Sequence, residues 1–449
     1  MSIKTLVIVE SATKAGVIEK YLNTNKETSS RAKFKVVASQ GHIRDISPKG
    51  KNMGIDPETF ECSWVLVNGK GKVVSNLKDW IKKTDFVYLA TDNDREGEGI
   101  AWHLKDHFKI PTSKCKRIVF NEITESALVR AVHNAKQIDQ PMVDSYTSRR
   151  ILDRLVGFMI SKLLWKSFES NVLLTTGRVQ GVALKEIIAK EDEIRAFDSM
   201  CYWTILGDFG THLQYTTLYR KGTVYKETTQ EHLVEMLKMF SKAAFTYLGS
   251  TLTTKKESPP SPFITSTLQQ VAYSSCGFSI KKTMSVAQEL YEMGAITYMR
   301  TDSTNISQDF TSQMKAHVAK TFGSTYASTS TAKRSSSNAK HAQEAHEAIR
   351  PTCVKRTFKL TSEQQRLYDL IYKRTLAYFM ANAVYHEVVV KIGCDKLSNE
   401  YEFVGKERVL YFDGWLRVYE KEVAKVTGEA LLSKYNQKNG EMNPITFTG

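Results

Sequence analysis

Short apolar runs alternate with longer amphipathic stretches over residues 1–138. The runs at 5–9 and 86–90 are almost continuously apolar, which is typical of parallel strands that are buried on both faces. Each run is followed by a loop and then by a helical pattern, at 15–22 and at 98–108. This alternation predicts an α/β domain built on a parallel sheet over residues 1–138.

The pattern changes after this first domain. Residues 139–195 show helical periodicity, and residues 196–258 are richer in strand-like segments. A proline-rich stretch follows and marks a boundary, because proline interrupts both helices and central strands. Helical patterns then fill 259–386, and strand-like alternation returns over 387–449. We therefore predict a multidomain α/β plus α and β protein with strand-rich segments at 196–258 and 387–449.

The chain is basic, with 63 Lys and Arg against 48 Asp and Glu and a formal net charge of +15. Such a surface either serves solubility or binds a polyanion, and the charge favours nucleic acid without separating DNA from RNA or from an anionic membrane. No apolar stretch approaches the roughly 18 residues of a membrane helix. The run at 5–9 is too short for a secretory signal, so an intracellular location is expected. The six cysteines contain no C-x-x-C pair, which argues against a zinc ribbon.

An acidic cluster directly follows the second predicted strand. Asp92, Asp94 and Glu96 recur at every second residue, so that their oxygens can converge on a hard cation such as Mg²⁺. The alternative is a solvated acidic turn, which a D-x-D pattern alone more often is. The cluster lies at the carboxyl end of a predicted buried strand, and this position favours a metal site. Gly97 and Gly99, which permit close backbone approach, favour it further.

A further carboxylate, Glu10, ends the first predicted strand much as Asp92 follows the second, so the two can face each other. A carboxylate at this place can act as a general acid or base, and Lys14 lies one helical turn later. Glu10 and Ser11 fit a helix-capping pair equally well. This segment alone does not separate the two interpretations.

A candidate nucleophile, Tyr298, lies in the segment 294–303. A phenol titrates near pH ~10 and is a poor nucleophile at neutral pH unless cationic neighbours favour its anion. Arg300 projects to the same side if the segment is extended, where it can serve both that anion and a phosphate. Taken alone, one of 20 tyrosines is more often a core residue.

Nine ordered segments of the chain resemble the type IA DNA topoisomerases, closest to the bacterial topoisomerase I branch. They are LVIVES (6–11), GHIRD (41–45), ATDNDREGE (90–98), FNEITE (120–125), SRRILDRLVG (148–157), TGRVQ (176–180), PFITSTLQ (262–269), ITYMRTDS (296–303) and HEAIRPT (346–352). The resemblance implies a Rossmann-like toprim domain over 1–138 and the first part of a helical domain that binds single-stranded DNA over 139–195. It also implies a β-rich arch domain, with a first pass over 196–258 and a second over 387–449, and a helical domain over 259–386 that bears the catalytic tyrosine. Together these domains form a toroid.

The resemblance also implies site residues. Catalytic roles fall on Tyr298, Glu10, Lys14, Arg300 and His346, and magnesium ligation falls on Glu10, Asp92, Asp94 and Glu96. DNA contacts are implied at His42, Arg95, Arg149, Asp153, Arg178, Gln180, Thr267, Gln269 and Asp302. On the residues alone, Arg149 fits equally well a solvated helix face or a local ion pair with Asp153 one turn later.

The activity implied by the resemblance is Mg²⁺-dependent and ATP-independent relaxation of negatively supercoiled DNA. One strand is cleaved through a 5′-phosphotyrosyl intermediate, another strand passes, and the break is religated. The expected partner is single-stranded or underwound DNA, and the protein is expected to be a monomer, without a membrane partner, in the cytoplasm or another DNA-containing compartment.

Two features of the family are not found in the chain. These are the zinc modules and the C-terminal part of the core, so a shortened core is expected. The alternative function is therefore a truncated homologue that binds single-stranded DNA without strand passage. A toprim nuclease or primase would fit Asp92 and Asp94, but it would leave Tyr298 and His346 unexplained.

Overall fold

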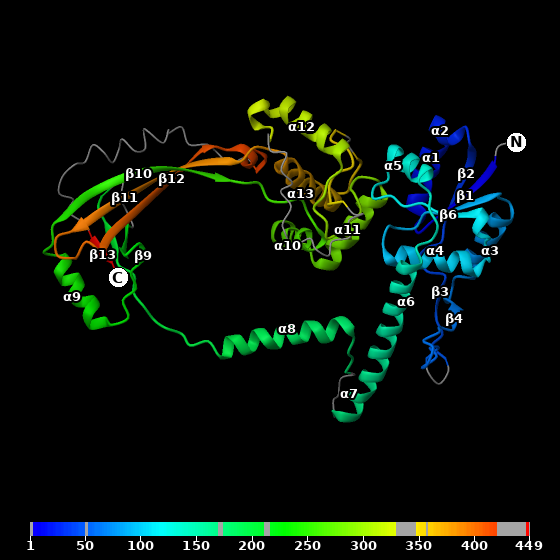
Figure 1. Ribbon diagram of the computed structural model, residues 1–449, viewed down its shortest axis with the longest axis horizontal. Helices are drawn as coiled ribbons and strands as arrows, with labels where there is room; N and C mark the ends of the chain where they lie inside the picture. The colour runs from blue at the N-terminus through cyan, green and yellow to red at the C-terminus, as the bar shows by residue number, and fades with distance from the viewer. Residues whose placement is uncertain are drawn as a thin grey trace. The chain divides into compact units, whose positions relative to one another are not determined.

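The computed structural model consists of two compact units, each built from several stretches of chain (Figure 1). Unit 1 comprises residues 1–196, 262–307 and 335–372, and unit 2 comprises 197–261, 308–334 and 373–449. The residues that the structure describes are 3–49, 53–168, 174–210, 216–328, 347–355, 358–419 and 446–448. The finer division into domains that the sequence suggests stays a prediction.

A four-stranded sheet forms the first part of unit 1, in the order β2-β1-β5-β6. Its strands are β1 (Ile3–Val9), β2 (Ala32–Ala38), β5 (Phe86–Leu89) and β6 (Cys115–Arg117), and neighbouring strands are parallel. Leu6 and Ile8 pack into one apolar core, and Val7 and Val9 pack into a second. Alternate side chains of β1 therefore enter two different cores, which explains the continuous apolar run. The predicted parallel strands are confirmed.

Helices and short strands complete this α/β domain. The helices are α1 (Ala12–Thr24), α2 (Lys26–Ser29), α3 (Gly71–Lys82), α4 (Arg95–His107) and α5 (Glu125–His133), with a 3₁₀ turn at Thr112–Lys114. A separate hairpin pairs β3 (Arg44–Ile46) with β4 (Trp64–Leu66). The helix predicted at 98–108 begins three residues earlier than expected. The N-terminal cap of this helix is Asp94, which the sequence presented only as part of the acidic cluster.

The predicted helical stretch over 139–195 is confirmed. It contains α6 (Gln140–Leu155), a π-helical turn (Val156–Ile160), α7 (Ser161–Ser167) and α8 (Arg178–Arg195). Several large apolar side chains are exposed here, among them Leu163 at 59% and Ile187 at 65%. The described part of this segment thus presents apolar surface rather than burying it.

The segment that carries Tyr298 packs against the α/β domain within unit 1. It follows α10 (Thr265–Cys276) and α11 (Ile280–Glu292), and both predicted helices are confirmed. Gly294 turns the chain after α11 with φ +75°, and a Cβ there would lie 2.7 Å from the carbonyl oxygen of Ile123. The turn therefore requires glycine. The N–H of Tyr298 then donates to the carbonyl of Asn121 at 2.8 Å.

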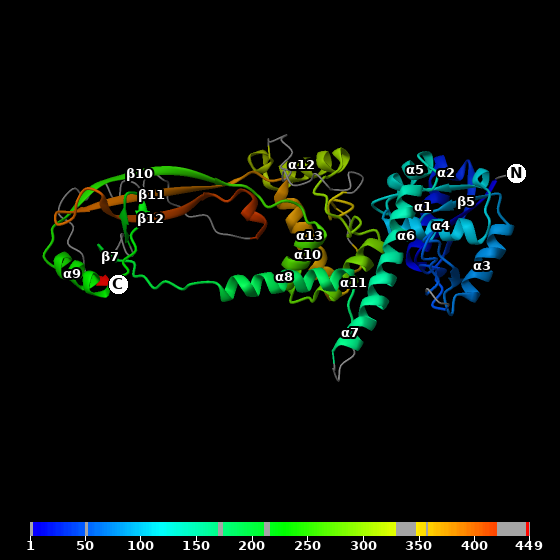
Figure 2. The same cartoon turned by 60° about the horizontal axis from the view of Figure 1, so that its bottom comes forward.

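Unit 2 is organised around one sheet that collects strands from both predicted passes (Figure 2). Its strands are β7 (Leu206–Asp208), β8 (Thr216–Arg220), β9 (Thr223–Val224), β10 (Phe245–Glu257), β11 (Ala383–Cys394), β12 (Tyr401–Phe412) and β13 (Thr446–Thr448). The long strand β10 pairs antiparallel with β11, which pairs antiparallel with β12. A core that includes Phe240, Phe245 and Phe403 joins α9 (Gln230–Phe240) to this sheet.

Four further helical elements lie partly or wholly in unit 2. They are α12 (Gln308–Phe322), α13 (Ser362–Tyr378), which runs from unit 1 into unit 2, and the 3₁₀ segments at Ser324–Tyr326 and Gly414–Tyr419. Among the described residues, no helix is both long and apolar enough to cross a membrane.

Candidate active site

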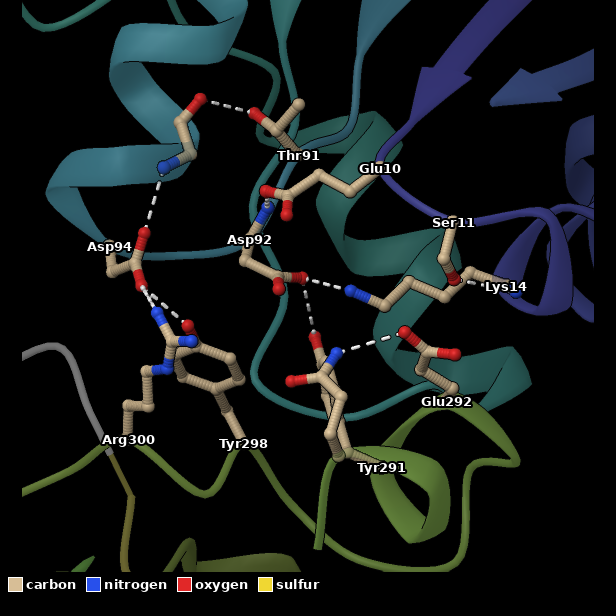
Figure 3. Close-up of polar contacts among 12 residues, drawn as sticks. Glu10, Ser11, Lys14, Thr91, Asp92, Asp94, Tyr291, Glu292, Tyr298 and Arg300 are labelled. Atoms are coloured by element: carbon tan, nitrogen blue, oxygen red, sulfur yellow. Dashed lines mark hydrogen bonds and ion pairs between the residues drawn. The ribbon is translucent and has the colours of Figure 1, made fainter. Parts of the chain in front are cut away.

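The site begins where two neighbouring parallel strands end. Glu10 follows β1, Asp92 follows β5 after two further residues, and the N–H of Asp92 donates to Glu10 Oε1 at 2.9 Å (Figure 3). The carboxyl ends of adjacent parallel strands lie at one edge of the sheet, so the two residues meet there. The structure thus brings Glu10 and Asp92 together as the sequence predicted.

Glycines shape the acidic loop, which consists of residues 90–94 between β5 and α4. Asp94 caps α4 by accepting a hydrogen bond from the N–H of Gly97 at 2.8 Å. A Cβ on Gly97 would lie 2.1 Å from the carbonyl oxygen of Asp92, and one on Gly99 would lie 2.6 Å from the ring of Tyr146. The predicted close approach is confirmed, although the approaching groups are the protein's own loop and a tyrosine of α6.

A buried arginine stabilises the acidic loop by hydrogen bonds to its backbone. Arg117 on β6 is completely buried and donates to the carbonyls of Thr91 and Asp92, at 2.8 and 2.7 Å. Its Nε donates to the carboxylate of Glu98 at 2.9 Å, which compensates its charge. Sequence reasoning missed this residue, because a Lys-Arg pair on a short segment more often indicates a solvated surface.

Lys14 neutralises part of the acidic charge. Its Nζ donates to Asp92 Oδ1 at 2.5 Å, and the residue is only 1% exposed. Ser11 caps α1 by accepting from the N–H of Lys14, while the carboxylate of Glu10 turns to Asp92. The capping interpretation is therefore confirmed for Ser11, whereas a general acid or base role for Glu10 stays a prediction.

A second tyrosine, Tyr291, was missed by sequence reasoning. It is buried at the end of α11, its hydroxyl donates to Asp92 Oδ1 at 3.5 Å, and Lys14 Nζ lies 4.8 Å from the centre of its ring. Its ring packs edge-on against Tyr298 at 5.1 Å.

The candidate nucleophile lies against the acidic loop. Tyr298 is buried, and its hydroxyl donates to Asp94 Oδ2 at 2.5 Å (Figure 3). Arg300 Nη1 lies 3.7 Å from the same oxygen, and its side chain is 58% exposed. Arg300 therefore projects to the side of Tyr298, as an extended segment predicted.

The electrostatics keep the phenol of Tyr298 protonated. Burial raises its pKa far above the usual value, and the charges of Asp94 and Asp92 raise it further, while Arg300 lowers it by less. Arg300 thus favours the phenolate, as expected, but burial and the two carboxylates outweigh its effect on the pKa of Tyr298. Asp94 is the closer charge, and Arg300 extends into solvent.

Two carboxyls of the site also retain protons more strongly than usual. Burial, followed by the charge of Asp92, raises the pKa of Glu10 to about 7, although Lys14 lowers it. Burial likewise raises the pKa of Asp92 against the opposing effect of Lys14. Such a cluster lacks positive charge.

The predicted convergence of Asp92, Asp94 and Glu96 on one cation is not observed. Within the ranges that the structure describes, no three His, Cys, Asp or Glu side chains are grouped to hold a metal ion. Lys14 contacts Asp92, and Tyr298 contacts Asp94. Glu96 lies in the first turn of α4 rather than on the preceding turn, and its carboxylate faces other partners, His42 at 3.4 Å and Arg149 at 4.0 Å.

The residues nevertheless fit a magnesium ion that shares its coordination with a substrate. Glu10, Asp92 and Asp94 line one cavity of about 410 Å³, together with Tyr298 and Arg300. Magnesium commonly uses one or two carboxylates and completes its shell with water and substrate phosphates. The pKa values of Glu10 and Asp92 are raised, which agrees with a site that binds an additional cation, because a cation would favour the ionised carboxylates.

A larger cleft of about 1020 Å³ adjoins this site and collects several predicted DNA contacts. Glu10, Asp94 and Arg300 line it from the catalytic side. The predicted DNA contacts that line it are His42, Arg95, Arg149, Gln269 and Asp302. The cleft shares Glu10, Asp94 and Arg300 with the cavity that Tyr298 lines.

The remaining predicted residues lie elsewhere. The hydroxyl of Thr267 accepts from the N–H of Ile264 at 3.1 Å, so it caps its own helix. Asp153 accepts two hydrogen bonds from Arg178, at 2.8 and 3.3 Å, so the proposed local pair of Arg149 with Asp153 is wrong. Gln180 is exposed on α8, and His346 lies outside the described residues.

One residue of the HEAIRPT segment connects the tyrosine segment to the α/β domain. Arg350 is buried, its Nη1 lies 3.1 Å from Glu122, and its Nη2 lies 2.6 Å from Glu347. Its carbonyl accepts from the N–H of Thr297, next to the candidate nucleophile. The sequence presented Arg350 only as the context of His346, so this role was missed.

Comparisons with known proteins show the family of this chain. A family model described as DNA topoisomerase matches residues 137–446, and one described as Toprim domain matches residues 5–123. The chain is 39% identical over 461 residues to the DNA topoisomerase 1 of Pasteurella multocida (strain Pm70). That match covers 92% of this chain and 51% of the relative, so the chain spans about half the relative's length.

A solved structure gives the same result. The full-length topoisomerase I of Thermotoga maritima matches with a TM-score of 0.78 and 35% identity, over 99% of this chain and 71% of that one. The family match, the relative and the solved structure agree with the ordered motifs. The chain belongs to the type IA DNA topoisomerases.

Proposed function

We propose that this chain cleaves one DNA strand through a 5′-phosphotyrosyl link to Tyr298, allows a strand to pass, and religates the break. The outcome is relaxation of negatively supercoiled DNA, dependent on Mg²⁺ and independent of ATP. The supporting observation is that the hydroxyl of Tyr298 lies 2.5 Å from Asp94, in one cavity with Glu10 and Asp92. Family membership supports the change of DNA topology in general.

Two carboxylates are placed to handle the protons. In cleavage, the phenolic oxygen of Tyr298 bonds to phosphorus, and the bond from phosphorus to the 3′ oxygen breaks. Asp94 already accepts the phenolic hydrogen bond and is placed to take that proton. Glu10, with a pKa of about 7, is protonated in part of the molecules at neutral pH and can protonate the leaving 3′ oxygen.

Religation runs the same transfers backwards. The 3′ hydroxyl returns its proton to Glu10 and attacks the phosphotyrosine, and the phenol recovers a proton from Asp94. One phosphate ester replaces another in each direction, so the bond is conserved and no ATP is required. Lys14 keeps its own hydrogen bond to Asp92 at 2.5 Å, which favours Glu10 over Lys14 as the proton donor.

Positive charge is what the site needs before the phenol can react. The side chain of Arg300 is largely exposed, and its Nη1 lies 3.7 Å from Asp94, which is a long distance for an ion pair. The guanidinium can therefore turn to an incoming phosphate. Glu10, Asp92 and Asp94 would hold magnesium, which supplies charge against the carboxylates and against the phosphate. His346 is a further proposed phosphate contact, from the family motif alone.

Replacement of the nucleophile tests the proposal. Tyr298→Phe should abolish relaxation of supercoiled plasmid and covalent trapping of DNA. Binding of a single strand should stay within about twofold, because the lost hydroxyl bonds to Asp94 and not to the strand. The matched control is Tyr273→Phe, which removes an exposed hydroxyl on α10. In trapping assays, label at the 3′ end of the oligonucleotide should stay with the protein.

The outcomes separate the candidate functions. If Tyr298→Phe still relaxes plasmid, the nucleophile is misassigned. A second candidate, single-strand binding without strand passage, is favoured by the exposed apolar side chains of α7 and α8. Such a protein would bind the oligonucleotide but give no topoisomer ladder, and a nuclease would give linear or permanently nicked plasmid.

A further inference from the structure

A chain of hydrogen bonds runs through the interior beside the larger cleft. Arg44 Nε donates to His103 Nδ1 at 3.2 Å. The hydroxyl of Tyr146 lies 3.4 Å from His103 Nε2 and 3.4 Å from His42 Nδ1. His42 Nε2 lies 3.4 Å from a carboxylate oxygen of Glu96. His103 and Tyr146 are buried, whereas His42 and Glu96 line the cleft.

The inner end of this chain of hydrogen bonds, at Arg44, fixes which groups donate and which accept. A guanidinium has only donors, so His103 Nδ1 must be the lone-pair acceptor. Burial lowers the pKa of His103 to about 2, so the ring is neutral and carries its single proton on Nε2. This N–H donates to the oxygen of Tyr146. The hydroxyl proton of Tyr146 is then free to be donated to His42 Nδ1.

The outer end requires the same arrangement. An ionised carboxylate only accepts hydrogen bonds. A carboxylate oxygen of Glu96 lies 3.4 Å from His42 Nε2, so this nitrogen has to carry the proton that is donated to the carboxylate. Both ends of the chain thus select the tautomer of His42 with Nδ1 bare and Nε2 protonated.

Packing keeps the rings of this chain in place. The ring of Tyr146 stacks on His42 with centroids 5.2 Å apart and an interplanar angle of 11°. On its other side a Cβ at Gly99 would lie 2.6 Å from it, so α4 leaves the ring no room. Trp64 and Trp102 pack against His103, at 4.4 and 4.8 Å between centroids.

We propose that Tyr146 is a positioning residue, which fixes His42 as the Nε2–H tautomer and so aims a neutral N–H donor into the cleft. In the free protein this N–H holds Glu96, and in the complex it is offered to a backbone phosphate of a single DNA strand. The last step rests on the proposed function, because it requires a strand in the cleft. The tautomer itself follows from the contacts alone.

The test uses the full chain with isotope-labelled histidine, and the probe is a single-stranded oligonucleotide without Mg²⁺. At about pH 8, imidazole nitrogen NMR should show a protonated Nε2 and a bare Nδ1 for His42, assigned with His42→Gln. Tyr146→Phe keeps the ring but loses the donor, so the His42 Nδ1 resonance should shift. Oligonucleotide affinity should fall about 2- to 10-fold, the effect of one net hydrogen bond.

Tyr88→Phe is the matched control, because it removes a hydroxyl from β5 outside the chain of hydrogen bonds; it should leave both readouts at the wild-type values. A proton on Nδ1 of wild-type His42 would overturn the proposal, and this result does not depend on whether Tyr146→Phe folds. Unchanged His42 resonances and affinity in folded Tyr146→Phe would also overturn it. If wild-type protein fails to bind the oligonucleotide, the phosphate contact and the proposed function fall, while the tautomer is still decided by NMR.

Discussion

At the residue scale, the groups that would perform the chemistry hold their protons more strongly than free side chains do. Tyr298, Glu10 and Asp92 all have raised pKa values, with burial as the largest cause. The sequence could locate these residues, because each follows a strand or lies in a recognisable segment. It could not give their protonation, since Asp94 and Tyr298 meet across 204 positions and burial depends on the packed fold.

The shifted carboxyl of Glu10 predicts a pH-dependent stability. Its folded pKa of about 7 exceeds the usual 4.5, so the folded state binds the proton more strongly, and stability is lost as pH rises through that interval. In EDTA, the unfolding temperature of wild type should fall more steeply than that of Glu10→Gln between about pH 5 and 8. Mg²⁺ should recover more of that loss in wild type than in the variant.

The control for this pH dependence is Glu235→Gln, which changes an exposed carboxyl on α9. Its pH profile should follow that of wild type. Thermal unfolding followed by circular dichroism, with and without Mg²⁺, gives all the curves. Parallel profiles for wild type and Glu10→Gln would show that Glu10 is not strained by its burial.

At the element scale, the apolar runs were sufficient to find β1 and β5, because strands that are buried on both faces are apolar throughout. They were insufficient for β6, whose Arg117 is completely buried although the segment reads as surface. What permits this burial is a set of loop carbonyls and Glu98, which only the folded sheet assembles. Local pattern cannot report such long-range compensation.

Removal of the Arg117 side chain should therefore be costly. Arg117→Met leaves Glu98 as a buried charge without its partner, which costs about 3–5 kcal/mol of unfolding free energy. The control Arg195→Met breaks an exposed ion pair with Glu191 on α8, worth about 0–1 kcal/mol. Urea denaturation of the full chain measures both. Equal midpoints for the two variants would mean that Arg117 does not hold the acidic loop.

At the scale of the whole molecule, composition indicated a nucleic-acid partner but not where it binds. The pairing of β10 with β11, which are separated by more than 120 residues, could be expected only from the family resemblance and not from the local pattern. The same holds for the cleft, which draws His42, Arg149, Gln269 and Asp302 from four distant segments. The formal charge of +15 is spread over the chain, so its share in the cleft must be measured.

Salt dependence of binding separates the cleft from the general charge. Affinity for a single strand should fall with salt, with a logarithmic slope of about −0.7 for each phosphate neutralised. Arg149→Gln removes one cationic side chain from the cleft and should reduce the magnitude of that slope by about 0.7. Lys238→Gln removes the same charge from exposed α9 in unit 2 and should leave the slope unchanged. Titration of a labelled oligonucleotide at several salt concentrations measures both, and equal slopes for the two variants would mean that binding follows overall charge and does not use the cleft.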